Sequence, residues 1–153
     1  MITLHFDGAC TPVNPGGVGT FGFVVDFHDG LSPLCASGVC DDGKPSTNNI
    51  AEYHGILCGL RLLHAKMTEN ENIQVFGDSA LVVNMVAGLW GRKNPHKNAP
   101  HLLPLLEEAT QIIAALSKRG NKISVRWIPR EKNEIADSLT KMAYKQYAKH
   151  TRK

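Results

Sequence analysis

Five stretches of the chain alternate apolar and polar residues, and this period of two is typical of β-strands. The first stretch sends Ile2, Leu4 and Phe6 to one face and the polar residues between them to the other. Short turns separate the first three stretches, which predicts an antiparallel meander. The predicted strands cover residues 2–10, 20–27, 34–39, 71–77 and 122–128.

Four other stretches repeat apolar residues at the spacing of a helix face. Thr47, Asn48 and Asn49 offer capping side chains at the start of the first helix. Glu52 falls at the head of the apolar stripe of this helix, so it is expected to face inward. The predicted helices cover residues 47–66, 80–87, 101–118 and 134–148.

This order of elements predicts an α/β fold, with a mixed five-stranded sheet and helices on its faces. A right-handed crossover would set the fourth strand parallel to the first. We expect one domain over residues 1–148 with a basic tail over 149–153, and we expect the chain to fray from Lys145 onward.

Composition adds few constraints. The net charge of +3 at pH 7 is compatible with a polyanionic partner. No apolar run approaches the ~20 residues that a membrane span needs, and no signal peptide is visible, so we expect the cytosol and no membrane partner. The four cysteines form no zinc pattern and are expected to be free thiols, with a Cys35–Cys40 disulfide as the minor alternative.

Four acids stand at the ends of these elements. Asp7 and Asp78 end strands, and Glu52 and Asp137 begin helices. Taken singly, each has an ordinary structural explanation: an Asx turn, a helix N-cap or compensation of the helix dipole. If the strand ends and helix starts meet at one edge, however, four carboxylates repel one another unless cations lie between them. Hard oxygen ligands favour Mg²⁺ or Mn²⁺, and a pair of such ions suits phosphoryl displacement.

The segment between the second and third helices breaks the helical pattern. It holds one aromatic residue and several basic residues among Gly, Asn and Pro. It is either a solvated loop or an arm that contacts phosphates with an aromatic face. The candidate contacts in this arm are Trp90, Arg92, Lys93 and Lys97.

Five short motifs occur together in the chain, in one order and spacing. Together they resemble type 1 ribonuclease H, most closely its compact archaeal-like members, and the resemblance covers nearly the whole chain. The motifs are Phe6-Asp7-Gly8-Ala9-Cys10, Asn14-Pro15-Gly16-Gly17, Thr47-Asn48-Asn49-Ile50-Ala51-Glu52, Gly77-Asp78-Ser79 and Asn133-Glu134-Ile135-Ala136-Asp137.

The resemblance implies the ribonuclease H fold with sheet order 3-2-1-4-5. It implies endonucleolytic hydrolysis of the RNA strand of RNA–DNA hybrids, giving 5′-phosphate and 3′-hydroxyl ends. The implied metal ligands and catalytic acids are Asp7, Glu52, Asp78 and Asp137. The implied hybrid contacts are Asn14, Asn48 and Asn49, with Thr47 near a DNA phosphate. Short amides of this kind can pair with ribose 2′-hydroxyls, which distinguish RNA from DNA.

The chain departs from the family pattern at three places. Ala80 stands where many members carry a Gln. The loop before the last helix lacks the usual His, and Arg130 is the nearest substitute, able to steady phosphate charge but not to act as a base. The long basic helix of some bacterial members is also absent.

Two alternatives therefore stay open beside a Mg²⁺-dependent hybrid-specific nuclease. The first is a broader ribonuclease that also cuts RNA–RNA duplexes, because the amide at position 80 is missing. The second is a non-catalytic hybrid-binding module, which has little reason to keep a repulsive acidic cluster under its substrate. A monomer is expected in each case.

Overall fold

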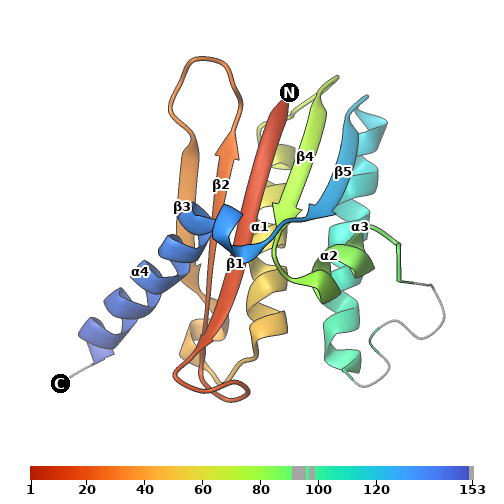
Figure 1. The fold of residues 1–153 in the computed structure, drawn as a ribbon. Helices are drawn as coiled ribbons and strands as arrows, with labels where there is room; N and C mark the ends of the chain where they lie inside the picture. The colour runs from red at the N-terminus through yellow and green to blue at the C-terminus, as the bar shows by residue number, and fades with distance from the viewer. Residues whose placement is uncertain (91–95, 97–98, 152–153) are drawn as a thin grey trace.

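A computed structural model describes residues 1–90, 96 and 99–151. The described chain has three layers, with a central sheet between helices (Figure 1). The strands are β1 (Ile2–Thr11), β2 (Val18–Asp26), β3 (Leu34–Val39), β4 (Asn72–Gly77) and β5 (Lys122–Trp127). The α-helices are α1 (Asn48–Ala65), α2 (Ala80–Val86), α3 (Leu103–Lys118) and α4 (Glu134–Thr151). Three short 3₁₀ turns are η1 (Cys40–Gly43), η2 (Pro100–Leu102) and η3 (Arg130–Lys132).

The sheet order is β3-β2-β1-β4-β5, which confirms the predicted topology. β1 pairs with β2 antiparallel and with β4 parallel, with Phe6 opposite Gly77 in the β1–β4 register. The parallel pairing requires the crossover through α1, as the sequence predicted. Because β1 and β4 run the same way, Asp7, which follows Phe6, lies beside the carboxyl end of β4. β1 itself continues to Thr11, so the prediction that Asp7 ends its strand is wrong.

The hydrophobic core lies between the sheet and helices α1, α2 and α3. Ile2, Leu4 and Phe6 of β1 are fully or almost fully buried, and they pack with the apolar face of α1. Helix α4 covers the opposite face, against β1, β2 and β3 (Figure 1). Gly22 permits this approach, because a Cβ there would lie 2.8 Å from the carbonyl oxygen of Ala136. Within the described residues, no helix is long and apolar enough to cross a membrane.

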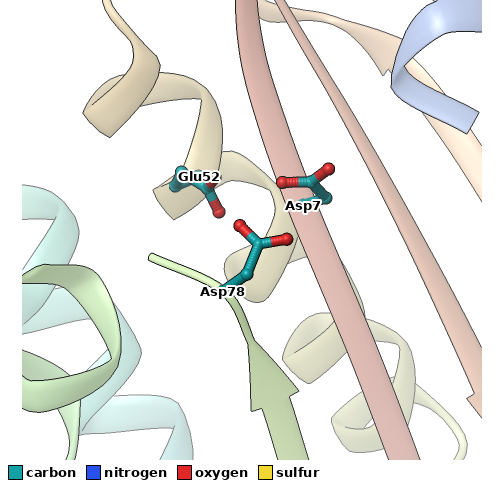
Figure 2. Close-up of side chains that lie close together, drawn as sticks. All are labelled: Asp7, Glu52 and Asp78. Atoms are coloured by element: carbon teal, nitrogen blue, oxygen red, sulfur yellow. The ribbon is translucent and has the colours of Figure 1, made fainter. Parts of the chain in front are cut away.

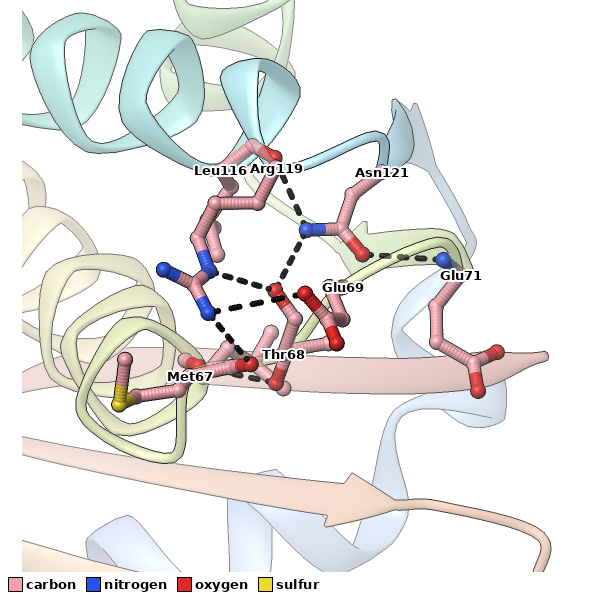
Figure 3. A network of polar contacts seen from close by, with 8 residues as sticks. Met67, Thr68, Glu69, Glu71, Leu116, Arg119 and Asn121 are labelled. Carbon is pink, nitrogen blue, oxygen red and sulfur yellow. Dashed lines mark hydrogen bonds and ion pairs between the residues drawn. The ribbon is translucent and has the colours of Figure 1, made fainter.

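The loops at the start of β4 and β5 are tied together by side-chain hydrogen bonds (Figure 3). Arg119 donates to the carbonyl oxygens of Met67 and Thr68 at 3.1 and 3.3 Å. The buried Asn121 amide donates to the Thr68 carbonyl oxygen at 2.8 Å and accepts from the Glu71 N–H at 3.0 Å. These bonds satisfy buried backbone groups and hold the two strands in register.

The end of α4 and the state of the cysteines can be compared with the sequence-based expectations. Helix α4 continues to Thr151, so the prediction that this helix ends near residue 148 is wrong. Lys149 and His150 stand in its last turn, where positive charge favours the helix dipole, and Glu134 and Asp137 stand in its first turn. All four cysteines are free thiols, as predicted.

Candidate active site

Three carboxylates converge at the carboxyl end of β4 (Figure 2). Asp7 lies in β1, Asp78 directly follows β4, and Glu52 lies in α1. One carboxylate oxygen from each lies within 4.8 Å of the others. The parallel pairing of β1 with β4 brings the two aspartates together, and close packing of α1 on β1 adds the glutamate.

Helix capping sets the start of α1 and therefore the position of Glu52. Thr47 is the N-cap, and its hydroxyl accepts a hydrogen bond from the Ile50 N–H at 3.2 Å. This cap satisfies one of the unpaired amides at the helix start. Glu52 is 6 % exposed and points toward β1, as its place at the head of the apolar stripe predicted.

Burial and mutual repulsion alter the protonation of this cluster. Asp7 is 4 % exposed, and burial together with the neighbouring Asp78 charge raises its pKa to about 7. Burial and the Asp7 charge raise the pKa of Glu52 well above its ordinary value. The cluster therefore strongly favours a cation or a proton between its oxygens.

The donor set fits a hard divalent cation. Glu52 Oε2 is buried and has no hydrogen-bond partner among the described residues, so burial leaves this oxygen without a donor. Asp7 Oδ1 accepts from the Gly8 N–H at 2.9 Å, which fixes the orientation of its carboxylate. Oxygen donors without Cys or His are the ligands that Mg²⁺ and Mn²⁺ prefer.

Asp137 shares the same pocket but has different partners. The pocket has a volume of about 310 Å³ and is lined by Asp7, Gly8, Ala9, Asn48, Asn49, Glu52, Asp78, Ser79, Arg130 and Asp137. Asp137 Oδ2 lies 3.1 Å from Lys141 Nζ, and its Oδ1 lies 3.7 Å from a guanidinium nitrogen of the exposed Arg130. The structure thus groups three of the four predicted acids and pairs the fourth with cations on the rim. Arg130 lines the pocket, and its guanidinium forms an ion pair with Asp137 there.

Two of the three predicted amides, Asn48 and Asn49, line this pocket, and Asn14 contacts Asn48 from outside the lining. The Asn48 side-chain oxygen accepts from the Cys10 N–H at 2.9 Å, and the Asn14 side-chain oxygen accepts from the Asn48 N–H at 3.0 Å. Because backbone N–H groups occupy their oxygens, both amides keep their NH₂ groups as hydrogen-bond donors for other partners.

The loop after α2 is only partly described. Trp90 is 53 % exposed. Arg92, Lys93 and Lys97 lie outside the described residues. His96 is buried, and its Nε2 hydrogen-bonds to the hydroxyl of the fully buried Tyr53 of α1.

Two residues that sequence reasoning did not assign to the site contact Asp78. The buried Asn133 amide donates to the Phe6 carbonyl oxygen at 2.8 Å and to Asp78 Oδ2 at 3.1 Å. The Trp127 indole N–H donates to the Asp78 carbonyl oxygen at 3.0 Å. An Asn just before the last helix was a weak signal for the first contact, and the sequence carried no signal for the second.

Comparison with known proteins agrees with this geometry. Residues 5–143 match the family model described as reverse transcriptase-like. The bifunctional protein Rv2228c of Mycobacterium tuberculosis is 35 % identical over 138 residues, covering 90 % of this chain and 34 % of that protein. The chain thus spans about a third of the length of this relative.

Two solved structures resemble the fold closely. The first is RNase H1 from the halophilic archaeon Halobacterium salinarum, with a TM-score of 0.74 and 27 % identity, covering 95 % of this chain and 98 % of that one. The second is LC11-RNase H1 in complex with an RNA/DNA hybrid, with a TM-score of 0.74 and 25 % identity, covering 97 % of this chain and 99 % of that one. The chain therefore belongs to the reverse transcriptase-like family, and the two solved structures to which it is similar are of RNase H1 proteins.

Proposed function

We propose that this domain is an endonuclease that hydrolyses the RNA strand of RNA–DNA hybrids and leaves 5′-phosphate and 3′-hydroxyl ends. The observation that carries the proposal is the buried cluster of Asp7, Glu52 and Asp78, which contains a buried oxygen without a donor and shares its pocket with the amides of Asn48 and Asn49. The similarity to a type 1 ribonuclease H in complex with an RNA/DNA hybrid supports the same substrate.

The resident cofactor in this proposal is Mg²⁺, with two ions per site, and Mn²⁺ is an alternative. Asp7, Glu52 and Asp78 would hold the ions, and Asp137 would complete the set from the rim. When bound, such a pair supplies an activated water and stabilises the leaving oxygen. The protein contributes the fixed orientation of its carboxylates, through the Gly8 N–H and the Asn133 amide.

The three predicted amides account for substrate choice in this proposal. The NH₂ groups of Asn14, Asn48 and Asn49 would donate to ribose 2′-hydroxyls and base edges across the wide minor groove of the hybrid. Thr47 would lie near a phosphate of the DNA strand. Arg130 would steady phosphate charge at the pocket rim. The arm residues would add phosphate contacts and a stacking surface: Trp90, Arg92, Lys93 and Lys97.

The test is cleavage of an end-labelled RNA strand in an RNA–DNA hybrid, with Mg²⁺, Mn²⁺ or EDTA. We expect metal-dependent cutting, and we expect Asp78→Asn to abolish it while the circular dichroism spectrum stays native. Full activity in Asp78→Asn would overturn the proposal. The ends of the products can be identified by their response to phosphatase and to ligation.

A broader duplex ribonuclease is the second candidate. It is favoured by Ala80, the first residue of α2, which offers no amide to the hybrid, and by Arg130 at the pocket rim. The same assay on an RNA–RNA duplex at equal salt separates the two functions. A hybrid-binding module without catalysis would instead bind the hybrid and cut neither duplex. The monomeric state and the cytosolic location stay predictions.

A further inference from the structure

The side chain of the last residue of β5 contacts the chain just beyond the end of the partner strand β4. Trp127 is the last residue of β5 and pairs with Gly77, the last residue of β4. The Ile128 N–H donates to the Gly77 carbonyl oxygen at 2.9 Å, and the Trp127 indole N–H donates to the Asp78 carbonyl oxygen at 3.0 Å. Two successive carbonyls, those of Gly77 and Asp78, are thus held by β5 and the residue after it.

The Trp127 bond falls where the backbone ladder ends. Beyond Gly77 the chain leaves the sheet and enters α2 within two residues, with Ser79 as the N-cap. The indole therefore restrains a carbonyl that the strand pairing does not reach. Trp127 is 52 % exposed, so burial alone gives little reason for so large an apolar side chain at this position.

Asp78 needs such restraint more than an ordinary turn residue does. Its carboxylate lies near those of Asp7 and Glu52, and repulsion between the three drives them apart. The indole N–H holds the main chain of Asp78, while the Asn133 amide holds its carboxylate at Oδ2. The segment that runs from β5 into α4 therefore holds both the main-chain carbonyl and the carboxylate of Asp78.

We propose that Trp127 is a positioning residue: through its indole N–H it keeps the Asp78 carboxylate directed toward those of Asp7 and Glu52. This inference rests on the proposed function and deepens it, because it concerns the assembly of the same cluster. Trp127 acts through Asp78 and does not itself bind the metal. Its removal should therefore weaken metal binding and turnover, with little change in hybrid affinity.

The test compares Trp127→Phe, which keeps an aromatic ring but loses the N–H, with the unmodified protein. Tyr144→Phe serves as a matched control, because it removes one hydrogen-bonding group, a hydroxyl, from an aromatic residue on α4 that does not line the active-site pocket. Mn²⁺ and Mg²⁺ binding are followed by calorimetry and by the rise in melting temperature that each metal causes. Hybrid cleavage then gives kcat, KM and the Mg²⁺ concentration for half-maximal rate.

For Trp127→Phe we expect metal affinity and kcat to fall about 5- to 10-fold, the size of one lost hydrogen bond, with KM within about twofold. Excess Mg²⁺ should restore part of the rate, and Tyr144→Phe should match the unmodified protein. Unchanged metal affinity in Trp127→Phe would overturn the inference, as would a loss confined to KM. The proposed function fails separately, if the unmodified protein binds metal but cuts no hybrid.

Discussion

Gly8 of β1 and Glu52 of α1 are in such close contact that a Cβ at Gly8 would lie 2.2 Å from the Glu52 backbone nitrogen. Real Cβ atoms do not approach backbone so closely, so any other residue at position 8 must push α1 away from β1. The close approach of helix to strand is what brings the Glu52 carboxylate within reach of Asp7 and Asp78.

Gly8→Ala should therefore separate the acids as well as destabilise the fold. We expect a loss of about 2–4 kcal/mol in the free energy of unfolding, from overpacking against backbone, and a fall in kcat of more than tenfold. Urea denaturation and hybrid cleavage measure the two effects. Gly30→Ala is the control, since its φ of +86° adds strain but nothing lies within 4 Å of the new Cβ. It should lose about 1 kcal/mol and keep full activity per folded molecule.

Asp78→Asn should stabilise the metal-free protein even though it abolishes cleavage. It removes a charge whose repulsion helps to raise the pKa values of Asp7 and Glu52, and an Asn can still accept from the Asn133 amide. We expect the free energy of unfolding in EDTA to rise by about 1–2 kcal/mol. Thermal denaturation in EDTA tests this, and an unchanged or lower melting temperature would contradict it. The added Mg²⁺ that stabilises the unmodified protein should have little effect on the variant.

Stability without metal should fall as the pH rises. The pKa of Asp7 is about 7 in the folded protein and near 3.8 when unfolded, so the folded state binds the extra proton. This contribution is complete below pH 3.8 and disappears as the pH passes 7. We expect Asp7 to account for a decrease on the order of 2–4 kcal/mol in the free energy of unfolding over this range.

The decrease should be visible in urea denaturation of the metal-free protein between pH 5 and pH 7.5. Asp7→Asn serves as the reference, and its profile should be flatter because the titrating group is absent. A profile for the unmodified protein as flat as that of Asp7→Asn would contradict the expectation. Saturating Mg²⁺ should flatten the profile of the unmodified protein as well, because the cation replaces the proton.

Asn14→Ala should weaken hybrid recognition without damaging the fold. Asn14 is exposed, and its oxygen accepts from the Asn48 N–H, so its loss removes one amide donor and loosens the next. We expect KM for the hybrid to rise about 5- to 20-fold at constant kcat, with a change of less than about 1 kcal/mol in the free energy of unfolding. Steady-state kinetics test this, and a fall in kcat at unchanged KM would exclude a binding role.

Much of the fold follows from local patterns in the sequence. Alternation predicts each strand, apolar spacing predicts each helix, and the Thr47 cap marks where α1 begins, because these signals depend on residues only a few positions apart. The crossover rule then makes β1 and β4 parallel, so the meeting of Asp7 and Asp78 could also be predicted.

Only the tertiary structure determined how the acids are held. The contact of Trp127 with the Asp78 carbonyl spans 49 residues, and that of Asn133 with the Phe6 carbonyl spans 127. The ion pairs of Asp137 with Arg130 and Lys141 likewise depend on where α4 begins relative to the pocket. Such contacts carry no local period or composition, because each depends on the orientation of one side chain after distant elements have packed together.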